Sequence, residues 1–328
     1  MYDFFEKILY RAIKKNVTDI HFYLKDNLKI SMRRYGILSH YDTFDKEKGS
    51  KLLNFIKYKS YINLNYKLLP QTGQFTFIID QQKYELRVSY LPSLEFESIV
   101  IRILNNHSRL TLDEITPLSQ IRNYLYQLTK KRNGLFVVSG ATGSGKSTTL
   151  YTLIDMFIKE GGLNIISIED PIEMRKEGCL QIELNEKIGI NYHDTLKQIL
   201  RHDPDIIMVG EIRDELTAQI CLTCALTGHL VLTTIHSSNA YLTLKRLMNL
   251  SFSSTDLEDV LIGILCQRLR YDRKNDNVVV LGELLEKKQI HDILLNNSYD
   301  YSTFKDNAKI LIEDMRYDKE LFEVEFNE

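Results

Sequence analysis

Several features are scarce or absent in this 328-residue sequence, and each absence excludes a class of protein. No apolar stretch approaches the roughly 18–20 residues that a membrane-spanning helix needs. The N-terminus is amphipathic and carries charges at close intervals. It lacks the uninterrupted apolar core and the small-residue cleavage site of a signal peptide. We therefore expect a cytoplasmic protein.

Neither sign of charge is in excess. The chain has 42 Lys and Arg against 44 Asp and Glu, which gives a net charge of −2. A nearly neutral protein has no overall electrostatic attraction to nucleic acid, so no direct nucleic-acid partner is expected. Apolar residues make up 44% and charged residues 26%, as in ordinary globular proteins, and the length suits about two domains.

Cysteine is also sparse: the chain has Cys179, Cys221, Cys224 and Cys266. Cys221 and Cys224 have the C-x-x-C spacing of zinc ligands, but a structural zinc site needs a second pair at suitable spacing, which is missing. Both lie in an apolar helical pattern. We interpret them as buried thiols and expect no zinc.

The two halves of the chain differ in pattern. Residues 1–105 alternate like antiparallel strands over 28–38 and 73–92, with a helical pattern over 48–62, which predicts an N-terminal α+β domain. Residues 106–117 lose the alternation and include a proline, so we interpret them as a linker.

From residue 118 to residue 328 the pattern predicts a second domain of α/β class. Near-continuous apolar strands at 135–139, 163–168, 205–210 and 230–235 alternate with helical stretches. Repeated strand–helix units predict a mostly parallel sheet covered on both faces. A helical C-terminal region is expected from about residue 254, with Thr255 and Glu258 spaced as a capping box.

The strongest motif is G-x-x-x-x-G-K-S, which follows a predicted strand and opens a predicted helix. Its backbone N–H groups and the helix N-terminus suit phosphate oxygens. Lys146 is expected to reach the β and γ phosphates and Ser147 to bind Mg²⁺. The predicted nucleoside triphosphate site is formed by Gly140, Ala141, Thr142, Gly143, Ser144, Gly145, Lys146, Ser147 and Thr148.

Acids and a histidine follow three other predicted strands. Glu169 and Asp170 end one strand, Glu211 ends the next, and His236 ends a fourth. Ligands of open α/β sheets bind outside the carboxyl ends of the strands, so these groups should converge beside the phosphate loop. Glu211 holds the position where phosphate-loop proteins place an acid near Mg²⁺, although that acid is usually an aspartate.

His229 and His236 flank one predicted strand. An extended run of seven residues spans up to about 23 Å, so the two cannot share one metal ion. His236 is the candidate for catalysis. For His229, a capping or packing role and a subunit-interface role both stay open.

The motifs together resemble those of the type II/type IV secretion ATPase family. The matching stretches are "GATGSGKSTTLY", "IISIEDPIE", "LRHDPDIIMVGEIRDELTAQ" and "TGHLVLTTIHSSNA", in the family's order and spacing, with weaker similarity in the first half. The resemblance implies ATP and Mg²⁺ as ligands, a RecA-like phosphate-loop core and a PAS-like N-terminal domain. The short chain without the zinc insertion is most similar to the assembly ATPases of competence pseudopili in Gram-positive bacteria.

The resemblance also implies partners and roles. It implies a homo-hexamer on the inner face of the cell membrane that works with a polytopic platform protein and, indirectly, with pilin-like subunits. Glu169 would position or activate the attacking water, Glu211 would support Mg²⁺ through water, and His236 would sense the γ-phosphate. Arg87 and Arg102 would reach the nucleotide from the N-terminal domain, while Arg201 and Arg213 are candidates for subunit contacts.

Three alternatives stay open at this stage. Arg87 and Arg102 also suit a solvated strand face. The chain also suits a pilus retraction ATPase or a nucleic-acid motor with a RecA-like core, although it lacks a basic stripe. A regulator that binds nucleotide but hydrolyses little of it is disfavoured, because it would not need Glu169, Glu211 and His236.

Overall fold

The chain divides into two compact units, Met1–Ser108 and Arg109–Glu328, each with its own apolar core. In the computed structural model, the described residues are 1–66, 68–104, 110–185, 189–250, 252–272, 276–314 and 317–327. No helix among them is long and apolar enough to cross a membrane.

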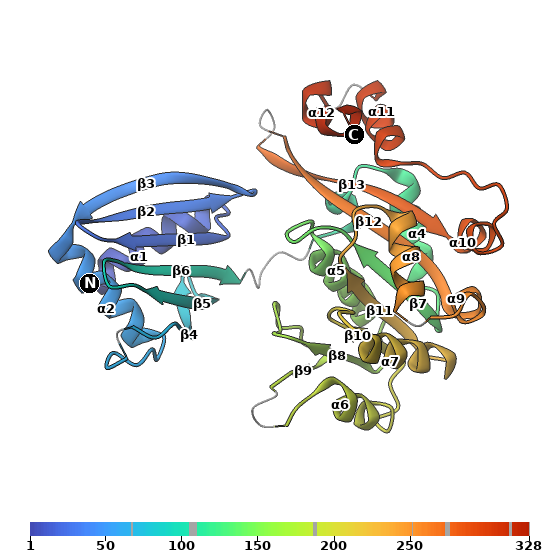
Figure 1. Cartoon of the computed structure of the whole chain (residues 1–328), viewed down its shortest axis with the longest axis horizontal. Helices are drawn as coiled ribbons and strands as arrows, with labels where there is room; N and C mark the ends of the chain where they lie inside the picture. The colour runs from blue at the N-terminus through green and yellow to red at the C-terminus, as the bar shows by residue number, and fades with distance from the viewer. Residues whose placement is uncertain are drawn as a thin grey trace. The chain divides into compact units, whose positions relative to one another are not determined.

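The first unit is a six-stranded antiparallel sheet with two helices, α1 (Tyr2–Lys14) and α2 (Lys46–Lys59) (Figure 1). Burial alternates along its strands, so one face packs against the helices and the other is exposed. The strand order is β3 (Ile37–Asp45), β2 (Asn27–Arg34), β1 (Asp19–Leu24), β6 (Glu97–Leu104), β5 (Gln82–Pro92) and β4 (Gln71–Ile79). The unit has the predicted α+β composition, and the PAS-like assignment stays a prediction.

The second unit contains a seven-stranded, mostly parallel sheet with helices around it (Figure 1). Its strand order is β13 (Asn277–Glu286), β12 (Leu261–Asp272), β7 (Gly134–Ser139), β11 (Leu230–Ile235), β10 (Ile206–Val209), β8 (Ile165–Glu169) and β9 (Leu180–Glu183). Every residue of the four strands β7, β8, β10 and β11 is buried, which agrees with the predicted parallel sheet covered on both faces.

The helices of this unit begin where the chain leaves the strands. Side chains of Asn191, Asp214 and Asn239 cap α6, α7 and α8 by accepting from backbone N–H groups of the first turn. From residue 119 onward, the helices are α4 (Ser119–Leu128), α5 (Lys146–Glu160), α6 (Tyr192–Ile199), α7 (Glu215–Leu226), α8 (Ala240–Asn249), α9 (Ser254–Val260), α10 (Lys287–Leu294), α11 (Phe304–Glu313), the 3-10 helix η2 (Lys319–Phe322) and α12 (Glu323–Asn327).

The expected helical region from residue 254 is corrected by the structure. Only α9 forms there before the chain enters β12, which pairs in parallel with β7, and β13, which pairs antiparallel with β12. A continuous apolar run is compatible with a buried strand or a buried helix, and pairing with β7 decides the outcome. The capping box of α9 is made by Ser253 and Asp256, not by Thr255 and Glu258.

Part of the segment interpreted as a linker forms a helix. Residues 106–109 lie outside the described residues, but 110–117 include a short helix, α3 (Leu112–Ile115). Leu112 and Ile115 are buried in the core of the second unit, because their spacing of three residues puts both on one face of the helix. These residues therefore belong to the second unit.

Candidate active site

The phosphate loop connects β7 to α5 and takes a shape that only glycine permits at two positions. Gly140 has a φ of +142°, and a Cβ added there would lie 2.4 Å from the backbone oxygen of Gln267. Gly145, with a φ of +88°, is the left-handed N-cap of α5. The loop therefore places the N-terminus of a 15-residue helix at the carboxyl ends of the parallel strands. The positive end of the helix dipole favours anions there.

Lys146 is the first residue of α5, and its ammonium group is nearly buried. Its Nζ donates to the carbonyl oxygens of Gly140 and Ala141, each at 3.0 Å. Burial lowers the pKa of Lys146, and the nearby carboxylates of Glu211 and Glu173 oppose that shift. The ammonium is held within the loop, at the place where phosphates are expected.

Glu169, the last residue of β8, is buried and fully hydrogen-bonded. Its carboxylate accepts from Ser167 Oγ at 2.6 Å, from Gln181 Nε2 at 3.1 Å and from the Tyr151 hydroxyl. Burial raises the pKa of Glu169, while these three hydrogen bonds act in the opposite direction. Tyr151 lies on α5, so this carboxylate ties the helix of the phosphate loop to the end of β8.

A chain of polar contacts crosses the sheet edge from the phosphate loop to the end of β8. His236 Nδ1 lies 3.2 Å from the Gly140 carbonyl oxygen, and its Nε2 lies 3.1 Å from Glu211 Oε1. Arg213 donates from Nε to Glu211 Oε2 at 3.1 Å and from Nη1 to Asp170 Oδ2 at 3.2 Å. Both His236 ring nitrogens thus face oxygen atoms, one on the phosphate loop and one on Glu211.

These groups line one cavity of about 470 Å³. The predicted residues that meet there are Thr142, Gly143, Gly145, Lys146, Ser147, Thr148, Glu169, Asp170, Glu211 and His236. Arg213, predicted as a subunit contact, lines the same cavity. The Ser147 hydroxyl and the Glu211 carboxylate supply oxygen ligands of the kind that Mg²⁺ prefers.

Several cavity residues were missed by the sequence analysis. Glu173 is exposed at the cavity, four residues beyond Glu169, and the acid at this spacing in "EDPIE" was a usable signal. Leu269 comes from β12, the strand mistaken for helix. Tyr151 and Gln181, which are not among the lining residues, hold the Glu169 carboxylate from positions 18 and 12 residues away, so no local pattern links them to it.

The other predicted residues lie elsewhere within their own units. Arg87 and Arg102 are cross-strand neighbours on the exposed face of the first unit's sheet, and Arg102 Nε bonds Asp19 Oδ1 at 2.8 Å. Arg201 is exposed after α6. The His229 ring lies at the C-terminal end of α7, 3.0 Å from the Cys224 carbonyl oxygen.

The two cysteines of the C-x-x-C pair are buried on α7, as predicted, and burial raises the pKa of Cys224 to about 12. Within the described ranges, no group of three or more His, Cys, Asp or Glu side chains is placed to hold a metal ion.

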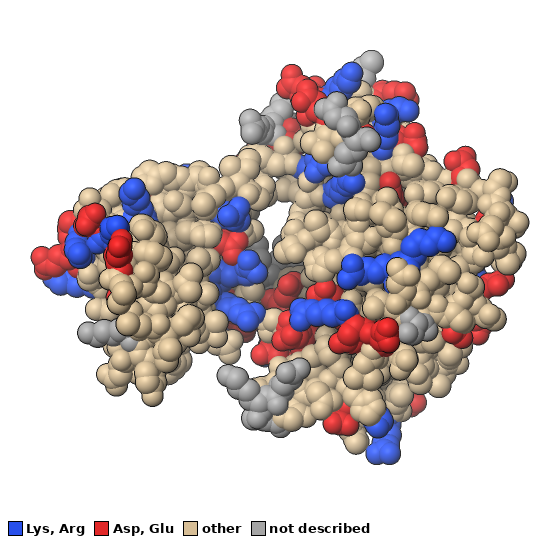
Figure 2. Space-filling view, in the orientation of Figure 1, with Lys and Arg blue, Asp and Glu red and all other residues tan. Residues whose placement is uncertain are grey.

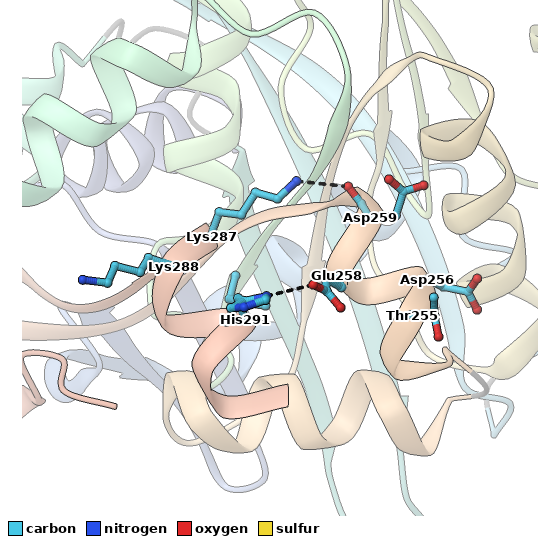
Figure 3. Close-up of a pocket in the computed structure, with 8 residues that line it drawn as sticks. Thr255, Asp256, Glu258, Asp259, Lys287, Lys288 and His291 are labelled. Atoms are coloured by element: carbon cyan, nitrogen blue, oxygen red, sulfur yellow. Dashed lines mark hydrogen bonds and ion pairs between the residues drawn. The ribbon is translucent and has the colours of Figure 1, made fainter. Parts of the chain in front are cut away.

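A second cavity, of about 670 Å³, lies between α9 and α10. Figure 3 shows His291 turned toward Glu258, with 2.8 Å between Nδ1 and Oε1, and Lys287 reaching the Asp259 carbonyl oxygen, while Lys288 points away. None of the predicted nucleotide-site residues lines it. The phosphate-loop cavity is therefore the candidate active site.

Comparisons with known proteins identify the family of the chain. The family model described as Type II/IV secretion system protein matches residues 1–304. The chain is 37% identical over 265 residues to competence protein ComGA of Halalkalibacterium halodurans, covering 80% of this chain and 76% of that protein. It is 36% identical over 266 residues to ComGA of Bacillus subtilis, covering 80% and 74%. A putative type II secretion system protein E of Escherichia coli is 37% identical over 264 residues, covering 80% of this chain and 53% of that protein.

Two solved structures share the fold. The Legionella pneumophila ATPase DotB superposes with a TM-score of 0.83 at 23% identity, covering 99% of this chain and 95% of DotB. The pilus retraction motor PilT with bound ADP superposes with a TM-score of 0.71 at 26% identity, covering 94% of this chain and 92% of PilT.

The buried carboxyl of Glu169 predicts a pH-dependent contribution to stability. An acid whose pKa is raised on folding stabilises the folded state at low pH, and this contribution is lost as the pH rises through the folded-state pKa. Glu169→Gln stays neutral. We therefore compare the thermal midpoint of Glu169→Gln with that of wild type by calorimetry. The midpoint of the variant minus that of wild type should be a few degrees larger at about pH 8 than at about pH 5.

Glu173→Gln serves as the control, because Glu173 is exposed. A difference between Glu169→Gln and wild type that stays constant over this pH range would contradict the burial argument.

Proposed function

The chain belongs to the Type II/IV secretion system protein family and is an ATPase, and we propose that it drives assembly of a competence pseudopilus. The pseudopilus would be type IV pilus-like and would serve DNA uptake. A related type II secretion machine is the alternative machine that the chain could drive. The observation that carries the proposal is that the phosphate loop, Glu211 and His236 meet in one cavity. The chain that holds them matches 76% of the length of ComGA from Halalkalibacterium halodurans.

Four polar residues of the cavity receive roles in ATP hydrolysis first. Mg²⁺, when bound, would neutralise phosphate charge, with Ser147 as a direct ligand and Glu211 acting through water. Lys146 would leave the loop carbonyls for the β and γ phosphates. His236 bridges the loop and Glu211, which suits a sensor of the γ-phosphate.

Glu169 would position or activate the attacking water. Its three donors favour positioning over proton abstraction, because each donor stabilises the carboxylate as an acceptor. Glu173 is the more exposed carboxylate at the same cavity and is a second candidate to contact that water.

The first unit would supply cations to the phosphates. Arg87 and Arg102 stand side by side on an exposed sheet face, and a developing phosphoryl charge needs cations beyond Lys146. Movement of this unit against the RecA-like core during ATP turnover would perform the mechanical work. A homo-hexameric ring, with Arg201 at a subunit contact, would transmit that work to a polytopic membrane platform and, through it, to pilin-like subunits.

We place the cytoplasmic protein at the inner face of the membrane through the segment between α2 and β4. Its exposed large apolar side chains, together with Tyr58 in the last turn of α2, are between 45% and 90% exposed, and they are Tyr61, Leu64, Tyr66, Leu68 and Leu69. From Lys48 to Ile79 the sequence has five lysines and no acid. Figure 2 shows β4 and this segment almost wholly in tan. Exposed tyrosine and leucine beside lysine suit an anionic lipid surface.

A pilus retraction ATPase is the second candidate, favoured by the match to PilT. A RecA-like nucleic-acid motor is the third.

Glu211→Gln tests the proposed ATPase site in vitro. The variant removes the charge between His236 and Arg213, and we expect the ATPase rate of the purified chain to fall about 100-fold or more. DNA should leave the wild-type rate unchanged. An unchanged rate in the variant would contradict the role of Glu211, and strong stimulation by DNA would favour the nucleic-acid motor.

The same variant separates assembly from retraction in the host. If the chain drives assembly, cells that carry only Glu211→Gln should lose surface pili and DNA uptake. An excess of surface pili would show a retraction ATPase instead.

The membrane surface is tested with a double substitution, Leu68→Ser with Leu69→Ser. We expect binding to vesicles of phosphatidylcholine and phosphatidylglycerol to weaken about tenfold in a flotation assay, because two exposed leucines no longer enter the lipid interface. The matched control is Ile37→Ser with Leu38→Ser, a similarly exposed pair at the start of β3 in the same unit. Unchanged flotation together with lost self-association would instead assign the segment to a subunit contact.

A further inference from the structure

The C-terminal segment that follows Phe304 lies beyond the residues matched by the family model. It is nevertheless docked on the second unit: α11 packs against β13, and η2 packs against β12. Phe322 of η2 is completely buried and belongs to the core of that unit. The segment therefore contributes contacts that the family pattern does not describe.

One charged residue of this segment is buried with it. The Glu325 side chain, on α12, is 0% exposed, and its carboxylate contacts two arginines of β12. Arg270 donates from Nε to Oε2 at 3.2 Å and from Nη2 to Oε1, while Arg268 Nη1 lies 3.6 Å from Oε1. A buried carboxylate is tolerated only when it is paired in this way, so these contacts fix α12 to β12.

The same stretch of β12 forms one wall of the phosphate loop. The Gln267 backbone oxygen approaches Gly140 so closely that no Cβ fits between them, and the Leu269 side chain packs beside Gly145. The Gln267 side-chain amide also bonds the Thr149 hydroxyl of α5, with Nε2 at 2.9 Å from Oγ1. Thus residues 267 and 269 touch the loop, while residues 268 and 270 bind Glu325.

Arg268 makes a further contact toward the active site. Its Nη2 lies 3.4 Å from the Ser238 carbonyl oxygen, two residues beyond His236. Its guanidinium also lies over the Phe304 ring, 4.2 Å from the centroid. The arginine held by Glu325 therefore also holds the segment that carries His236.

We propose that Glu325 is a positioning residue of the ATPase site. By holding Arg268 and Arg270, it keeps β12 against the phosphate loop and against the segment after His236. A loop that is already in its binding shape loses less conformational entropy when nucleotide binds, so Glu325 raises nucleotide affinity. The proposal rests on the ATPase activity and does not depend on which machine that activity drives.

The test compares Glu325→Gln with Glu323→Gln in the full chain. Glu323 is an exposed acid on the same helix and serves as the matched control. We expect Glu325→Gln to raise the Kd for a fluorescent ADP analogue and the KM for ATP about five-fold or more, with a smaller change in kcat. Glu323→Gln should leave all three at wild-type values.

Two further variants separate positioning from stability. Glu325→Asp keeps the charge and should give an intermediate Kd, and Arg270→Gln should raise the Kd as Glu325→Gln does. The double variant Glu325→Gln with Arg270→Gln should raise the Kd little beyond the value of either single variant. If Glu325→Gln does not fold, as judged by its thermal midpoint, these two single variants carry the test.

A wild-type Kd in the folded variants, or an equal loss of affinity in Glu323→Gln, would overturn the proposal. A wild-type chain that binds no nucleotide would contradict the ATPase assignment instead.

Discussion

Parallel pairing of β7 with β11 on one side and β12 on the other determines the geometry of the nucleotide site. Ser139, the last residue of β7, is in register with Ile235 and Cys266. The residues that follow Ser139, Ile235 and Cys266 are Gly140, His236 and Gln267, respectively. These three residues therefore lie side by side. This register explains why His236 contacts the Gly140 carbonyl oxygen and why the Gln267 backbone requires a glycine at position 140.

The site balances its charges through contacts within the chain. Lys146 is satisfied by two carbonyl oxygens of its own loop, and Glu211 by His236 and Arg213. Triphosphate oxygens would compete for the same cations. Nucleotide binding would then alter the contacts among β7, β10 and β11 together, which gives a physical route from phosphate chemistry to movement of larger elements.

Much of the site could be predicted from the sequence, because local patterns determine the groups at the carboxyl ends of parallel strands. The glycine spacing around Lys146 and the apolar runs before Glu169, Glu211 and His236 are such patterns. The run from Leu261 was mistaken for helix because its pairing with β7 is non-local. The contacts of Glu325 with β12 depend on residues more than 50 positions away, so no sequence window contains them.

The most direct measurement of the central claim is an experimental structure of the chain with Mg²⁺ and a non-hydrolysable ATP analogue. We expect the triphosphate at the N-terminus of α5, with Lys146 Nζ transferred from the Gly140 and Ala141 oxygens to the β and γ phosphates. We also expect the Ser147 hydroxyl to be a ligand of Mg²⁺ and His236 to lie beside the γ-phosphate. A triphosphate bound elsewhere, or Lys146 still held by both carbonyl oxygens in the complex, would contradict the central claim.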